Sequence, residues 1–119
     1  SSAASDVYKR QVLKNMWVDA ERCLANIHSQ NGLVMAEKVM IDLVDHGIPR
    51  DEAHEILRAA SFEAVDKNIE LIDVCSRTPA IAAAFSAEQL EAMFEPSNHI
   101  GVSGEIVDEC VALARQAIQ

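Results

Sequence analysis

The feature that most constrains the fold is an apolar pattern with helical spacing, interrupted by residues that end helices. Within residues 33–45, apolar side chains recur three, four and seven positions apart, so they share one face of an α-helix. Gly47 and Pro49 follow at once. Glycine readily ends a helix, and proline is accepted in the first turn of a new one. The pattern therefore predicts one helix over residues 33–45 and a second that runs from Pro49 to about Asp66.

Similar signals predict further helices on both sides of this pair. Asp19 can cap a helix that continues to Ile27, and Ser86 with Gln89 has the spacing of a capping box. Ser103 is the expected cap of a last helix. Short helices over residues 71–77 and 79–85 complete an all-α domain of six or seven helices. An aromatic content of only 4% also argues against a β-sandwich core.

The net charge of −9 and the cysteine pattern limit the partners and the compartment. Proteins that bind nucleic acids or anionic membranes need clustered Lys and Arg, and the negative net charge of this chain opposes such binding. We therefore expect neither as a partner. No run of about 18 apolar residues is present, so no membrane-spanning helix is expected. The three cysteines form no CxxC pair. Each lies beside apolar helical positions, so buried thiols in a reducing cytosol are the favoured interpretation, and the sequence favours a cytoplasmic protein.

The first eleven residues, SSAASDVYKRQ, fit nothing that follows them. The segment from Asp6 to Gln11 can be read as the translation of gat gtg tat aag aga cag, which resembles the end of a transposase-based sequencing adapter. We therefore expect residues 1–11 to be adapter-derived and the helical domain to occupy residues 12–119. The alternative is an ordinary serine-rich disordered terminus. The underlying codons would decide between the two.

Residues suited to catalysis or metal binding are sparse. The four histidines have neither HExxH spacing nor a nearby cysteine pair, so no metal site is predicted. His54 could be a partly buried structural histidine or a general base, and the structural interpretation is favoured because no partner is evident. The acidic side chains between Asp42 and Glu55 are interpreted as a solvated face. No catalytic residue is predicted in this chain.

Four segments in order, over roughly residues 16–111, resemble the C-terminal region of one enzyme family. They are residues 18–26 (VDAERCLAN), 32–40 (GLVMAEKVM), 47–55 (GIPRDEAHE) and 94–101 (FEPSNHIG), the last followed by Ile106, Val107 and Asp108. The family is the fumarase/aspartase superfamily, specifically its adenylosuccinate lyase branch. Cys23, Leu24 and His99 depart from the usual family residues, so no substrate contact is expected from Leu24.

The resemblance implies the C-terminal part of a lyase of purine biosynthesis. Such an enzyme splits adenylosuccinate to AMP and fumarate, and splits the succinylated aminoimidazole-carboxamide ribotide in the same way, by β-elimination. It implies a homotetramer that needs no cofactor. The catalytic histidine, the mobile Ser-Ser-x-Met-Pro loop and the phosphate-binding arginines of the family lie upstream of the matching segments. Asn26 matches a family position near the substrate cleft and is the one substrate-binding residue expected here.

Two alternatives remain open at this stage. One is the tail of a 3-carboxy-cis,cis-muconate cycloisomerase, a relative with a similar C-terminal region. The turn formed by residues 47–50 (GIPR) favours the adenylosuccinate lyase branch over it. The other is a free-standing helical interaction module, which an exposed apolar helix face would suit.

Overall fold

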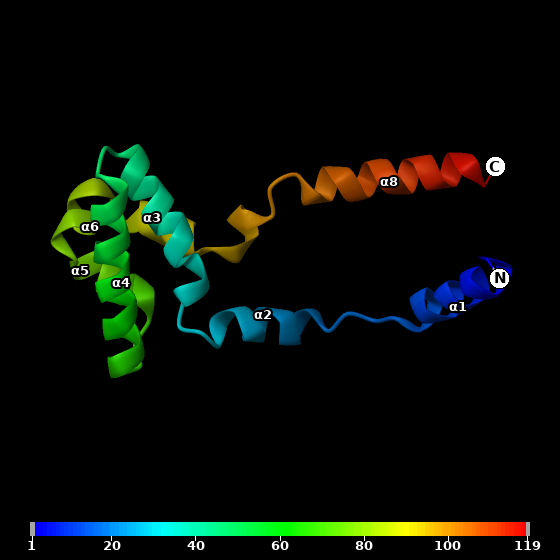
Figure 1. Cartoon of the computed structure of the whole chain (residues 1–119), viewed down its shortest axis with the longest axis horizontal. Helices are drawn as coiled ribbons and strands as arrows, with labels where there is room; N and C mark the ends of the chain where they lie inside the picture. The colour runs from blue at the N-terminus through cyan, green and yellow to red at the C-terminus, as the bar shows by residue number, and fades with distance from the viewer. Residues whose placement is uncertain (1, 119) are drawn as a thin grey trace.

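The computed structural model describes residues 2–118, and every regular element in that range is helical. The elements in chain order are α1 (Ser2–Asn15), α2 (Ala20–His28), the 3₁₀ helix η1 (Leu33–Met35), α3 (Ala36–Asp45), α4 (Arg50–Lys67), α5 (Leu71–Arg77), α6 (Pro79–Ala84), α7 (Ala87–Phe94), the 3₁₀ helix η2 (Pro96–His99) and α8 (Ser103–Ala117) (Figure 1). The all-α prediction is confirmed, and α2 to α8 correspond to the seven predicted helices. α1 crosses residue 11, and the interpretation of residues 1–11 as foreign stays a prediction.

Three of the predicted helix caps and stops are present in the structure. Asp19 caps α2, because its Oδ1 accepts a hydrogen bond from the Arg22 N–H at 2.9 Å. Ser86 and Gln89 form the capping box of α7, with reciprocal hydrogen bonds of 3.2 and 2.8 Å. Gly47 follows α3 with a left-handed φ of +95°, which glycine adopts without strain.

Two predicted helix starts are wrong by a few residues. The helix expected from Leu33 begins with a 3₁₀ turn, in which the Met35 N–H donates to the Gly32 carbonyl, and α3 begins only at Ala36. Ser103 is the first residue of α8 rather than its cap. Its hydroxyl donates instead to the Ile100 carbonyl at 2.6 Å, so it stabilises the preceding turn.

The core forms where α3 packs on α4. Val39 and Leu43, one turn apart on α3, are completely buried. The facing stripe of α4 has the spacing four, three and four residues, and three of its four members are alanines: Ala53, Leu57, Ala60 and Ala64. Small side chains allow the two helices to approach closely. Helices α5, α6 and α7 complete the core with Leu71, Val74, Cys75, Ile81, Phe85 and Leu90.

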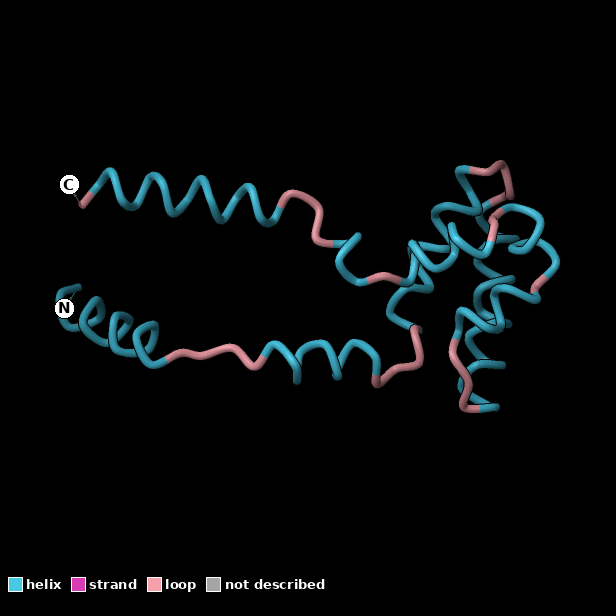
Figure 2. Tube along the Cα trace, turned by 180° about the vertical axis from the view of Figure 1, so that it is seen from behind, coloured by secondary structure: helices cyan, strands magenta, loops and turns pink. Residues whose placement is uncertain are grey.

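The molecule has a compact body, α3 to α7, and two long arms. The arms, α1–α2 and α8, leave the body toward the same side, and both termini lie at their far ends (Figures 1 and 2). The radius of gyration is 20.3 Å, whereas a compact domain of this length has about 13–14 Å. None of the described residues of α1, α2 or α8 is buried.

The core also determines how the three thiols should react. The prediction of buried thiols is confirmed for Cys75, and desolvation raises its pKa from 9.0 to about 11. The prediction is wrong for Cys23 and Cys110, which are exposed. A pKa two units higher leaves about a hundredfold less thiolate at pH 8, and the thiolate is the reactive form. We expect a thiol reagent at pH 8 to modify Cys23 and Cys110 quickly in the folded chain and Cys75 only after unfolding in urea.

The control is Cys75→Ser, which should lose only the slow phase of this titration. Equal rates for all three thiols in the folded chain would contradict burial of Cys75.

Candidate functional site

The arm formed by α2 presents the predicted substrate contact to solvent. Asn26 lies in the last turn of α2 and is exposed. Its backbone carbonyl accepts a hydrogen bond from Ser29 Oγ at 2.7 Å, which satisfies a carbonyl near the C-terminal end of the helix. The structure therefore places Asn26 on an accessible face, where an amide can both donate and accept hydrogen bonds.

An elbow of two left-handed residues, Asn31 and Gly32, joins α2 to the body. Their φ angles are +51° and +78°. The Asn31 carbonyl accepts from the Leu71 N–H at 2.9 Å, and its side-chain amide donates to Asn68 Oδ1 at 3.2 Å. A Cβ atom on Gly32 would lie only 3.0 Å from Cε1 of Phe94. The elbow is thus tied to residues that follow it by about forty and about sixty positions.

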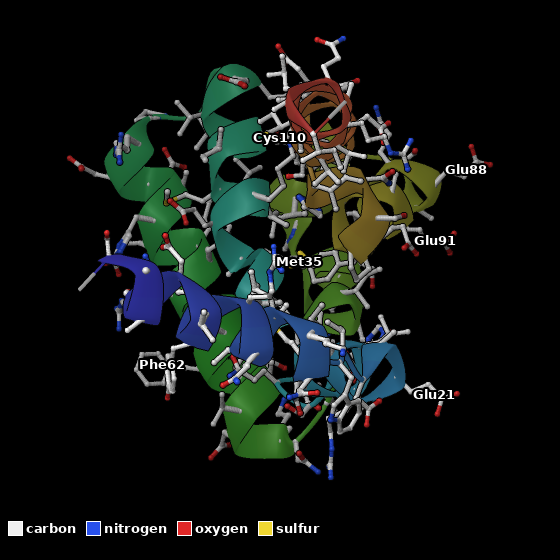
Figure 3. All side chains as sticks on the ribbon, turned by 90° about the vertical axis from the view of Figure 1, so that its right-hand side faces the viewer. Glu21, Met35, Phe62, Glu88, Glu91 and Cys110 are labelled. Carbon is white, nitrogen blue, oxygen red and sulfur yellow. The ribbon has the colours of Figure 1, made fainter. Side chains whose placement is uncertain are left out.

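A hollow of about 190 Å³ lies at this elbow, at the base of α2. Most of the residues that line it are apolar, but polar atoms make up nearly half of its surface, and one imidazole and one carboxylate are present: Ile27, His28, Gly32, Val34, Met35, Glu70, Ile72, Phe94 and Pro96. Figure 3 looks along the arms and shows Met35 near the middle of the molecule, where the arms meet the body. The hollow adjoins Asn26 in sequence, because the next two residues of α2 line it.

The segment after α7 holds one side of this hollow in place. The His99 imidazole makes a 2.6 Å hydrogen bond to the Met93 carbonyl, and Asn98 Nδ2 donates to the Ala92 carbonyl at 2.8 Å. Both bonds satisfy carbonyls at the C-terminal end of α7. Hydrogen bonds from the Ser97 hydroxyl and backbone N–H lower the pKa of Glu95, and the charge of nearby His28 lowers it further. The segment therefore has a structural role.

The other sequence candidates do not assemble into a catalytic group. His54 was expected to be partly buried, and that expectation is wrong, because 64% of its side chain is exposed. The prediction of a solvated acidic face is confirmed for Asp45, Glu52 and Glu55, which are exposed. It is wrong for Asp42, whose side chain is only 16% exposed and pairs with Lys38, whereas Glu55 pairs with Arg58 at 2.7 Å. The Arg58 guanidinium lowers the pKa of Glu55. These pairs lie along the surfaces of α3 and α4, away from Asn26.

Neither a metal centre nor a membrane span is evident in the described chain. Residues 2–118 contain no group of three or more His, Cys, Asp or Glu side chains placed to hold a metal ion. Within the same range, no helix combines the length and apolar character needed to cross a membrane.

The sequence profile described as "Adenylosuccinate lyase C-terminus" matches residues 32–110, from the elbow to the middle of α8. The chain belongs to this family. The match covers the whole compact body, together with η2 and half of the α8 arm.

Individual relatives extend the similarity over most of the chain. An adenylosuccinate lyase from Archaeoglobus fulgidus is 29% identical over 109 residues, 92% of this chain and 24% of the relative. One from Methanocaldococcus jannaschii is 32% identical over 83% of this chain and 21% of the relative. A 3-carboxy-cis,cis-muconate cycloisomerase from Acinetobacter baylyi is 36% identical over 89% of this chain and 23% of the relative. No solved structure matches the chain significantly.

The chain therefore spans about a quarter of the length of the curated relatives it matches. Sequence reasoning proposed Asn26 but missed the hollow beside it. His28, Glu70 and Phe94 are far apart in the sequence, and only the folded body brings them together. The Asn31–Gly32 pair, which favours left-handed backbone, was the one local signal of the elbow.

The elbow yields a test of its own. Gly32→Ala should lower the free energy of unfolding by about 1–3 kcal/mol, because alanine is strained at this φ and its Cβ would press on the Phe94 ring. Urea unfolding followed by circular dichroism measures the change.

Gly104→Ala is the matched control. Gly104 lies in α8 with nothing within 4 Å of an added Cβ, so this variant should leave the stability of the body unchanged. Equal destabilisation by the two substitutions would contradict the account of the elbow.

Proposed function

We propose that this chain is the C-terminal part of an adenylosuccinate lyase, which cleaves adenylosuccinate to AMP and fumarate in purine biosynthesis. The same enzyme would cleave the succinylated aminoimidazole-carboxamide ribotide. The observation that supports the proposal most strongly is the family match over residues 32–110. The archaeal adenylosuccinate lyases, which align with 83–92% of the chain, support it further.

The reaction is a β-elimination. A base removes a proton from the carbon next to a carboxylate, and an acid protonates the nitrogen that leaves. No base, acid or nucleophile of this chain is assigned to those steps. In the proposed enzyme they belong to the upstream part of the subunit, as the family resemblance implies. No cofactor is part of this proposal.

The proposed contribution of this chain is a substrate contact on a braced arm. Asn26 would hydrogen-bond the substrate from the exposed face of α2. The elbow bonds from Asn31 to Leu71 and Asn68 would fix the direction of α2, so that Asn26 meets the substrate at a defined position. We propose a homotetramer in the cytoplasm, where the three unpaired thiols would stay reduced.

A second candidate is the cycloisomerase reaction, favoured by the 36% identity to the Acinetobacter baylyi enzyme. The two activities use different substrates, so parallel assays of the complete lyase on adenylosuccinate and on 3-carboxy-cis,cis-muconate distinguish them. Fumarate release from adenylosuccinate supports the first proposal. Turnover of the muconate alone would replace it with the second.

Substitution of Asn26 tests the proposed contact. In the complete enzyme, Asn26→Ala should lower kcat/KM for adenylosuccinate by about 10- to 100-fold, the cost of roughly one or two lost hydrogen bonds to a charged substrate. Steady-state kinetics of fumarate release measure the effect. The 119-residue chain alone should release no fumarate.

Gln116→Ala, an exposed amide on α8, is the control and should leave kcat/KM unchanged. An Asn26→Ala enzyme with unaltered kinetics would remove Asn26 from the site. Turnover by the 119-residue chain alone would show that the catalytic groups are in this chain after all.

A further inference from the structure

The last helix, α8 (Ser103–Ala117), has an apolar face that nothing in the described structure covers. Val107, Val111 and Ile118 are 59%, 40% and 86% exposed, and Ala114 lies exposed between them. α8 extends away from the body (Figure 1). The arm thus offers a helical surface for association.

The spacing on this face is that of a two-stranded coiled coil. Val107, Val111, Ala114 and Ile118 are separated by four, three and four residues, as are the core positions of a heptad repeat. Such a seam is covered by another helix of similar length that has apolar residues at the same spacing. A second copy of α8 meets both requirements.

The charges beside the seam specify the orientation of the two helices. Asp108 and Arg115 directly follow Val107 and Ala114, so they occupy the same flank, seven residues apart. They are about 10 Å apart along one helix, too far to pair with each other. In an antiparallel pair, Asp108 of each copy faces Arg115 of the other, which gives two symmetric ion pairs. In a parallel pair, these residues would face the neutral Ser103 and Cys110.

We propose that α8 is a self-association surface, on which two copies of this chain pair antiparallel along Val107, Val111, Ala114 and Ile118. Antiparallel helix dipoles add to the attraction. The contact has two-fold symmetry, so each patch meets its own copy and this contact by itself joins only two chains. A contact of two fifteen-residue helices is smaller than most specific interfaces, so the dissociation constant should be on the order of 10–100 μM. This surface is independent of the lyase activity.

Charge reversal and restoration test the proposal in the 119-residue chain. By sedimentation equilibrium at low salt, Asp108→Arg and Arg115→Asp should each weaken the dimer about tenfold, because each places like charges face to face. The double variant, with both charges exchanged, should regain the original affinity. No α8 residue is buried, so these variants leave the body folded, and circular dichroism verifies that.

Two further variants define the surface. Val111→Asp should abolish the dimer, because it places a charge in the seam, and Glu91→Arg on the exposed surface of α7 should leave it unchanged. A chain that stays monomeric up to about 1 mM would overturn the proposal. A double exchange that fails to restore the affinity would also overturn the proposal. Either result would mean that a different segment, and not a second copy of α8, covers the α8 face.

Cross-linking checks the orientation. The antiparallel pairing places Cys110 of one copy beside Ala117 of the other, so Ala117→Cys in a Cys23→Ser background should form disulfide-linked dimers with diamide. Diamide takes up the two electrons and two protons that two thiols release. The same background with Ala117 retained should cross-link at least tenfold more slowly. Equal rates would show that Cys110 and position 117 of the two copies are not adjacent and would overturn the proposed antiparallel orientation.

Discussion

The contact between α3 and α4 is the one on which the rest of the structure depends. Val39 and Leu43 are completely buried there, and the alanines of α4 let them approach the α4 backbone. Each fully buried aliphatic side chain contributes about 1.5–3 kcal/mol to the free energy of unfolding, and the other helices of the body pack around this contact. α5, α6 and α7 each add one to three buried residues to it. The Asn31 elbow, in turn, is held by the start of α5.

The size of that core explains the shape of the molecule. Among the residues that the structure describes, thirteen apolar ones are buried, and these lie between Met35 and Leu90. The helices on either side have amphipathic sequences but no described buried residue, so their apolar faces are available to other parts of an assembly. The separation into body and arms gives the two parts of the chain different roles. The body fixes the direction of the arms, and the arms present Asn26 and the α8 seam to whatever they bind.

Local features of the sequence were sufficient to predict the helices. The capping box at Ser86, the cap at Asp19 and the stop at Gly47 act within a few residues, so their effect does not depend on the fold. The start of α3 was missed because Gly32 is held in its turn beside Phe94, a residue sixty positions later. The exposure of His54 and the hollow beside His28 were missed for the same reason. Both depend on which elements pack together, and helical periodicity does not reveal that.

Hydrogen exchange tests the central claim that a self-contained body, α3 to α7, supports two arms whose described residues are not buried by the rest of the chain. In dilute solution, below the concentration at which α8 would pair, backbone amides in residues 36–94 should exchange slowly and together. Amides in residues 20–28 and 103–117 should exchange at least a hundredfold faster, because no residue of those helices is buried and short isolated helices open readily. Equally slow exchange in the arms and the body would contradict the account, since it would require arms that are packed within the chain itself.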